Sequence, residues 1–151
     1  MSIEKDIHQN KFRNEYQRAS VNLAFTYYWL IERVKNILQP ADITMQQFNI
    51  LRILRGSHPK PLSTLQIRER MIDKMSDTSR IVERLIKKGL VKKAISGKDR
   101  RLVDVVITVK GRNLLKKLDR RQTELDGILK NISEDEAVRL SKILDKIRGT
   151  V

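Results

Sequence analysis

Apolar residues recur at helical spacing along most of this chain, and the first run is the longest. Its apolar positions are separated by four, three, four and three residues: Leu23, Tyr27, Leu30, Val34 and Ile37. This spacing predicts a helix from about Ile7 to Leu38, which Pro40 ends. Further apolar side chains widen the stripe beyond one face. We therefore expect this helix to pack against its own domain and against a second subunit.

Three helix-start signals follow in the next third of the chain. Each is a residue that commonly caps a helix N-terminus, and two have Gln three positions later: Thr44 with Gln47, Ser63 with Gln66, and Asp73. Gly56 and Gly89 supply ends for the first and third of these helices. Met75, Thr78, Ile81, Val82, Leu85 and Ile86 are expected on the buried side of the third helix. Three short helices, the last two joined by a tight turn, predict a helix-turn-helix.

A β-hairpin is predicted directly after these helices. Residues 90–95 and 102–108 are rich in β-branched and other strand-compatible residues, and residues 96–101 form the turn between them. This turn carries the positively charged residues Lys98, Arg100 and Arg101. Their charge suits insertion into the narrow minor groove of DNA. Asp99 is expected to support the turn as a hydrogen-bond acceptor. The hairpin therefore has the position and charge of a wing beside a recognition helix.

The last third returns to helical patterns. Thr108 caps a long predicted helix with apolar positions from Leu114 to Ile132, and Ser133 with Glu136 forms a capping box for a final helix. Both ends of the chain carry apolar stripes that one small domain cannot cover, so we expect them to form a dimer interface: Leu23, Tyr27, Leu30, Leu140, Leu144 and Ile147.

The expected fold is mainly α with a small β-hairpin, namely a winged helix-turn-helix with long N- and C-terminal dimerisation helices. We expect one structural domain built from an N-terminal dimerisation helix (residues 1–40), a DNA-binding lobe (residues 41–112) and C-terminal dimerisation helices (residues 113–151).

The outward face of the predicted recognition helix carries the candidate DNA contacts. With its apolar residues inward, helical periodicity turns polar and charged side chains toward DNA: Ser76, Asp77, Ser79, Arg80 and Arg84. An ordinary solvated helix face fits this pattern equally well. Asp77 would also be repelled by phosphate unless it accepts a hydrogen bond from a cytosine amino group. The adjoining basic hairpin favours the DNA-binding interpretation.

Charge points to the same class of partner. The chain has 32 Lys and Arg against 18 Asp and Glu, a net charge of +14. Residues 55–112 contain sixteen of these cations and only six acids, so the excess is concentrated around the predicted hairpin. Such a patch indicates nucleic acid first and an anionic membrane surface second. The longest apolar stretch falls short of the ~20 residues that a membrane span needs, so we expect a cytoplasmic protein without a membrane partner.

Other chemistry finds little support in the residues. The chain has no cysteine, which excludes disulfides, thiolate metal sites and thiol-based redox sensing. His8 and His58 fit solvated side chains better than metal ligands. No catalytic constellation is visible, so we expect neither an enzyme nor a cofactor. An aromatic cluster from Phe25 to Trp29 fits core packing better than an effector pocket.

Several segments resemble the winged-helix core of the MarR family of bacterial transcription regulators. They are Glu69-Arg70-Met71, the run from Asp77 to Leu85, the run from Lys87 to Val91, and the wing residues Asp99, Arg101, Ile107 and Thr108. The resemblance covers about residues 44–118. One departure is Asp73-Lys74-Met75, which replaces a small, hydroxyl-rich entry to the recognition helix.

The resemblance implies a homodimer that binds a pseudo-palindromic operator, of a kind often released by a small-molecule effector or an oxidant. It makes Arg101 the minor-groove arginine of the wing, with Asp99 and Glu83 supporting it. From these observations we expect a sequence-specific, double-stranded DNA-binding repressor. The alternatives are a basic architectural protein that coats DNA without sequence choice and a helical adaptor that docks on an anionic membrane or protein.

Overall fold

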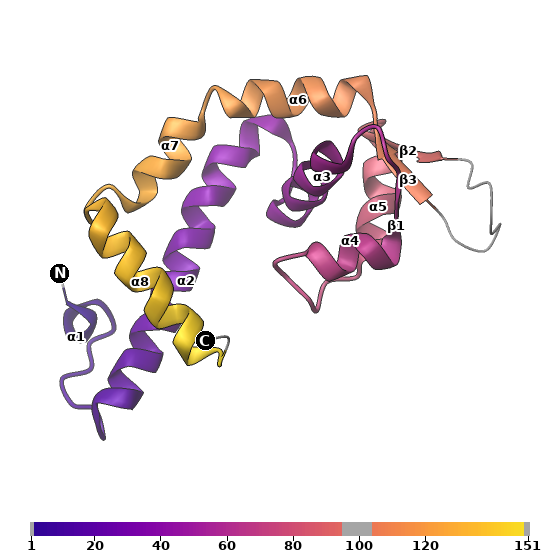
Figure 1. Cartoon of the computed structure of the whole chain (residues 1–151). Coiled ribbons are helices and arrows are strands. Elements are labelled where there is room, and N and C mark those ends of the chain that lie inside the picture. The colour runs from indigo at the N-terminus through magenta and orange to yellow at the C-terminus, as the bar shows by residue number, and fades with distance from the viewer. Residues whose placement is uncertain (1, 95–103, 150–151) are drawn as a thin grey trace.

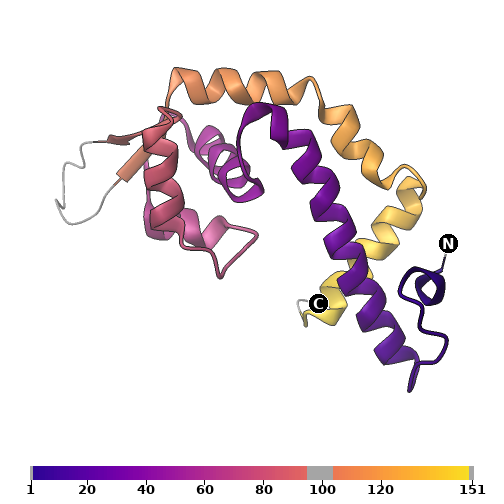
Figure 2. The same ribbon diagram turned by 180° about the vertical axis from the view of Figure 1, so that it is seen from behind.

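The helices form an arch in which α6 joins two groups of elements (Figures 1 and 2). This computed structural model describes residues 2–94 and 104–149. The elements in chain order are α1 (Ile3–Asp6), α2 (Glu15–Leu38), α3 (Met45–Ser57), β1 (Leu62–Ser63), α4 (Thr64–Arg70), α5 (Thr78–Lys87), β2 (Val91–Ala94), β3 (Asp104–Ile107), α6 (Val109–Asp119), α7 (Gln122–Asp126) and α8 (Glu134–Ile147). Short 3₁₀ turns at Gln39–Ala41 and Gly127–Leu129 follow α2 and α7.

The helix starts that the sequence predicts from capping pairs are confirmed at α3, α4 and α8. At α3, the Thr44 hydroxyl accepts from the Gln47 N–H at 3.2 Å, and the Gln47 side chain accepts from the Thr44 N–H at 3.1 Å. Ser63 and Gln66 form the same kind of reciprocal hydrogen-bonded pair at the start of α4. At α8, hydrogen bonds from the backbone and hydroxyl of Ser133 lower the pKa of Glu136. These caps satisfy N–H groups that have no partner within the helix.

The hairpin is confirmed in its described part, and it belongs to a larger sheet than predicted. β2 and β3 pair antiparallel, with Val91 opposite Ile107. β1 pairs with the other edge of β3, with Leu62 opposite Val105, so the strand order is β1-β3-β2. The predicted turn at residues 96–101 lies outside the described residues. β1, which directly precedes α4, therefore fixes the base of the hairpin against the start of that helix.

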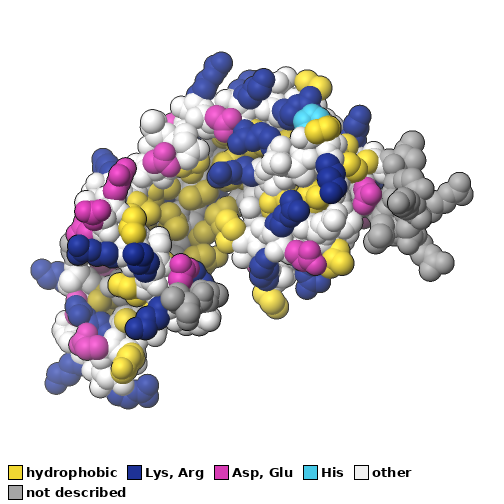
Figure 3. Space-filling view, viewed as in Figure 1, with side chains coloured by type: hydrophobic (Ala, Val, Ile, Leu, Met, Phe, Trp, Pro, Cys, Tyr) yellow, Lys and Arg dark blue, Asp and Glu magenta, His cyan; other side chains and the backbone are white. Residues whose placement is uncertain are grey.

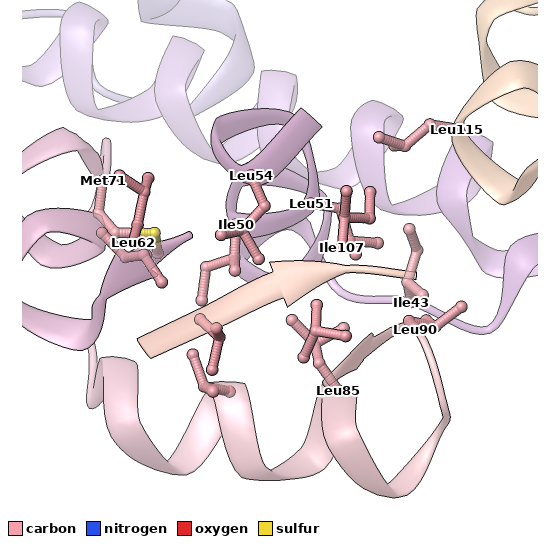
Figure 4. Close-up of a cluster of buried hydrophobic side chains, with 14 of the residues drawn as sticks. Ile43, Ile50, Leu51, Leu54, Leu62, Met71, Leu85, Leu90, Ile107 and Leu115 are labelled. Atoms are coloured by element: carbon pink, nitrogen blue, oxygen red, sulfur yellow. The ribbon is translucent and has the colours of Figure 1, made fainter. Parts of the chain in front are cut away.

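One apolar core unites α3, α4, α5, the sheet and α6 (Figure 4). Its fully buried side chains come from every one of these elements: Ile50, Leu51, Leu54, Leu62, Ile67, Leu85, Val91, Val105, Ile107 and Leu115. Close packing of this kind holds the two helices of the helix-turn-helix and the hairpin in one rigid unit. We call this unit the winged-helix lobe.

Two predicted long helices are shorter than expected. The first, predicted from about Ile7, begins only at Glu15 as α2, because the Asn14 side chain caps it by accepting from the Gln17 N–H. The short α1 lies before the predicted start. The second, predicted from Thr108 to beyond residue 129, ends as α6 at Asp119. There Arg121 turns to donate to the Ile37 carbonyl, which draws α7 against α2.

The recognition helix also begins later than predicted. Asp73 was the expected cap, but its carboxylate accepts from the Met75 N–H at 3.0 Å within a local turn. Asp77 caps α5 instead, accepting from the Arg80 N–H at 3.1 Å. Met75 therefore lies in the connection before α5, and it is 93% exposed rather than buried. The segment from Ile72 to Asp77 is a turn between the two helices.

Candidate nucleic-acid interface

The two faces of α5 differ sharply in environment. Thr78, Val82 and Leu85 are buried against the lobe, as the periodicity predicts. The opposite face is exposed over its whole length and carries Ser79, Arg80, Glu83, Arg84 and Lys87. A helix held by one face in a rigid core can present its other face to a partner without reorganising. This outer face of α5 is the first element of the candidate site.

The N-terminal end of α5 carries two predicted contacts that already have local roles. The Asp77 carboxylate caps the helix and lies 3.7 Å from Nε of Arg80. The half-buried Ser76 precedes the helix, and its hydroxyl donates to the Asp73 carbonyl at 2.8 Å. Because the cap and this ion pair occupy Asp77, its negative charge is partly offset beside the surface that would meet phosphate.

An open hollow of about 420 Å³ lies between the start of α4 and the start of α5. Its lining comes from both helices and their connection: Thr64, Leu65, Arg68, Met75, Ser76, Asp77, Thr78 and Ser79. We call it the α4–α5 groove. Leu65 and Arg68 are not among the contacts predicted from the sequence, and the apolar spacing predicts Met75 in the core. The Ser63 cap could have indicated Leu65 and Arg68, because the start of α4 fixes which side chains lie in its first turns.

The base of the hairpin carries further positive charge. A second hollow, of about 540 Å³, lies where the hairpin meets the start of α6, and its charged and titratable lining is basic: His58, Lys92, Lys110 and Arg112. One ring nitrogen of His58 lies 2.9 Å from a guanidinium nitrogen of Arg112. The predicted contacts Lys98, Arg100 and Arg101 and the predicted support Asp99 lie outside the described residues. Glu83, the other predicted support, is exposed on the flank of α5.

Apolar side chains are exposed on the other arm of the arch. Tyr27 is 54% exposed on α2, and Ile147 is 65% exposed on α8. Leu23 and Leu140 are also exposed, whereas Leu30 and Leu144 are half-buried. Figure 3 shows apolar side chains gathered on the inner face of the arch. The aromatic residues Phe25, Tyr27 and Tyr28 are likewise exposed, so the core-packing interpretation of that cluster does not hold within one chain.

The described part of the chain contains no helix that is both long enough and apolar enough to cross a membrane. The arrangement that remains is a basic helix-turn-helix, exposed along its second helix and flanked by a hairpin that begins immediately after it. This arrangement defines a winged helix-turn-helix protein.

Comparisons with known proteins identify the family. The model of the MarR family matches residues 43–103. A MarR transcription factor from Planctomyces limnophilus is 30% identical, with 89% of this chain and 98% of that chain covered and a TM-score of 0.68. A mutant MarR from E. coli complexed with operator DNA is 22% identical over 91% of this chain and 99% of that chain, with a TM-score of 0.80.

A curated relative, the HTH-type transcriptional repressor IacR of Pseudomonas putida, is 25% identical over 93% of this chain and 85% of its own length. The chain belongs to the MarR family of transcription regulators. The family is one of regulators rather than enzymes, and the resemblance found in the sequence is confirmed.

Proposed function

We propose that this protein is a homodimeric repressor that binds a specific, pseudo-palindromic site in double-stranded DNA. The observation that carries the proposal is the free outer face of α5, which presents Ser79, Arg80 and Arg84 beside the base of the hairpin. Hydroxyl and guanidinium groups at this position of a helix-turn-helix can reach base edges and phosphates in the major groove. One similar structure, the mutant MarR from E. coli, is a complex with operator DNA, and the relative from Pseudomonas putida is a transcriptional repressor.

The dimer follows from the exposed arm of the arch. Within the described residues α8 buries none of its side chains, and α2 buries only Ile37 and Leu38. A 14-residue helix is marginal in water by itself, and α8 has only half-buried side chains to hold it, which supports a partner surface for its exposed apolar residues. We assign residues 1–40 and 113–151 to dimerisation and residues 41–112 to DNA binding. A two-fold dimer would place its recognition helices in half-sites ~10 base pairs apart.

Sedimentation tests the dimer. Leu140→Glu places a charge in the apolar stripe of α8 and should convert the protein to monomers at micromolar concentration. Lys142→Glu is the matched control, because Lys142 lies on the opposite face of the same helix and its loss should leave the dimer intact. A wild-type protein that sediments as a monomer would refute this part of the proposal.

Selection of preferred sites from a random duplex pool tests sequence specificity. The selected site should bind on the order of a thousandfold tighter than random duplex at the same stated salt concentration. Equal affinity for both would favour the architectural alternative. Arg80→Ala should relax preference at a defined base pair, at a cost of ~1–3 kcal/mol. Arg120→Ala, at the exposed end of α6, is the control and should leave base preference unchanged.

We also propose, from its sequence, that the turn of the hairpin binds DNA. Arg101→Ala should weaken binding to the selected site and lower the slope of log affinity against log salt by about 0.9. Lys98→Ala should weaken binding less, because a lysine is more strongly hydrated than an arginine. An Arg101→Ala protein that melts at a lower temperature would instead assign this residue to the scaffold of the turn. We place the regulator in the cytoplasm, where bacterial DNA lies, and we assign its release to a small ligand.

A further inference from the structure

The turn between α4 and α5 exposes large apolar side chains on an otherwise polar surface. Met75 is 93% exposed, Ile72 is 77% exposed, and Leu65, in the first turn of α4, is 59% exposed. Scattered apolar residues on a surface need no explanation, but Ile72 and Met75 lie together on the segment that leads into the recognition helix. The sequence pattern placed Met75 in the core, so a separate reason for its presence here is needed.

The backbone of this turn is held in place although the Met75 side chain is not. The Met75 N–H donates to the Asp73 carboxylate at 3.0 Å, and the Ile72 N–H donates to the Asn49 side chain of α3 at 2.9 Å. The Ser76 hydroxyl closes the turn onto the Asp73 carbonyl. The backbone at Met75 therefore has a fixed position, and it does not have to be ordered when a partner arrives.

Met75 and Leu65 line the same side of the molecule as the predicted DNA contacts. Both border the α4–α5 groove, which they share with Arg68 and Ser79. Among the described residues that line the groove, Asp77 is the only acid, and its carboxylate is occupied as the cap of α5. A partner that fits this groove combines negative charge with a small apolar group at its surface. Duplex DNA has both in its major groove, where the C5 methyl of thymine is the apolar group.

We propose that Met75, supported by Leu65, contacts a thymine methyl group in each half of the DNA site and thereby contributes to base preference. This inference rests on the proposed function, because it assumes that the outer face of α5 enters the major groove. It adds a type of readout that the polar side chains of α5 cannot provide. Arginine and serine read hydrogen-bonding groups, whereas an apolar side chain distinguishes thymine by its methyl group alone.

Replacement of single thymines by deoxyuridine in the selected DNA site tests the proposal, because it removes only the methyl group. One thymine in each half-site should be sensitive, with affinity falling about fourfold per site, which corresponds to the ~0.8 kcal/mol of one buried methyl group. The Met75→Ala protein should bind the thymine site more weakly than the wild type. It should no longer distinguish thymine from deoxyuridine at that position. Met75→Leu, which keeps an apolar side chain, should retain the discrimination.

Two controls separate this role from a structural one. The melting temperature of Met75→Ala should match that of the wild type, because the side chain packs against almost nothing in the folded chain. Val109→Ala removes another exposed apolar side chain, at the start of α6 and outside the α4–α5 groove, and should not alter discrimination.

The outcomes distinguish failure of the inference from failure of the proposed function. If a site is selected but no deoxyuridine replacement changes affinity, the methyl contact is refuted and the exposed residues serve another partner, such as a protein. If a replacement matters equally to the wild type and to Met75→Ala, the methyl is read elsewhere and the assignment of Met75 is wrong. If no site is selected at all, the proposed function fails and this inference fails with it.

Discussion

Gly111 lies in the first turn of α6, in close contact with the backbone of Leu90 and the side chain of Ile107. A Cβ atom added at Gly111 would lie 2.3 Å from the backbone oxygen of Leu90 and 2.8 Å from Cγ1 of Ile107. The same Leu90 oxygen accepts hydrogen bonds from the N–H and the hydroxyl of Thr108, at 3.0 and 3.1 Å. Since α6 connects the lobe to α7 and α8, we expect Gly111→Ala to disturb both stability and the position of those helices.

The size of the effect follows from these contacts. Because the nearest atom is backbone, rotation of a side chain cannot relieve the clash, and α6 must move away from the lobe. Overpacking of this kind costs ~1–3 kcal/mol, and the movement weakens the two Thr108 hydrogen bonds, which contribute ~1 kcal/mol each. The better helix propensity of alanine returns ~1 kcal/mol. The expected net loss in the free energy of unfolding is about 3 kcal/mol.

Gly56 provides the matched control within the same protein. It is also a helical glycine, near the end of α3, but it is exposed and a Cβ added there meets no atom within 4 Å. Gly56→Ala should therefore raise the free energy of unfolding by ~0.5–1 kcal/mol.

Urea unfolding followed by circular dichroism measures both changes. All proteins must be compared at one concentration, because the stability of the proposed dimer would depend on it. A Gly111→Ala protein with the urea midpoint of the wild type would refute the reasoning, since it would show that α6 can move without loss.

Three further predictions concern single groups. Asp77→Ala should lower the free energy of unfolding by ~1 kcal/mol through loss of the α5 cap, whereas Asp77→Asn, which keeps an acceptor, should leave it nearly unchanged in urea unfolding. Thr78→Val should unfold at the same urea concentration as the wild type or higher, because the Thr78 hydroxyl is buried without a partner among the described residues; a large loss would contradict this. The pKa of Glu4 is lowered to about 2 by hydrogen bonds from its backbone, Ser2 and Arg18, so its stabilising contribution should be complete above pH 4.5 and lost as the pH falls toward 2. An NMR titration of the Glu4 carboxyl should give that value, and Arg18→Ala should raise it.

The sequence by itself determined the features that depend on neighbouring residues. The caps at Thr44, Ser63, Thr108 and Ser133 were all predicted and all observed, because each hydroxyl bonds to an N–H only three residues away. The inward face of α5 and the strands of the hairpin followed in the same way from spacings of 3.6 and 2 residues. These predictions placed the helix-turn-helix and the hairpin side by side, which was enough to indicate the family.

Other features were decided by contacts between distant segments. β1 is only two residues long and forms because Leu62 meets Val105, which no local pattern indicates. The helix after Thr108 ends where Arg121 finds the Ile37 carbonyl, 84 residues away in the chain. Met75 continues an apolar spacing that is typical of a buried side chain. It is nevertheless exposed, because Asp77 rather than Asp73 caps α5, and the turn before it is bonded to Asn49 of α3. Two aspartates with equal capping propensity leave the local sequence ambiguous, and only the packing of the lobe decides between them.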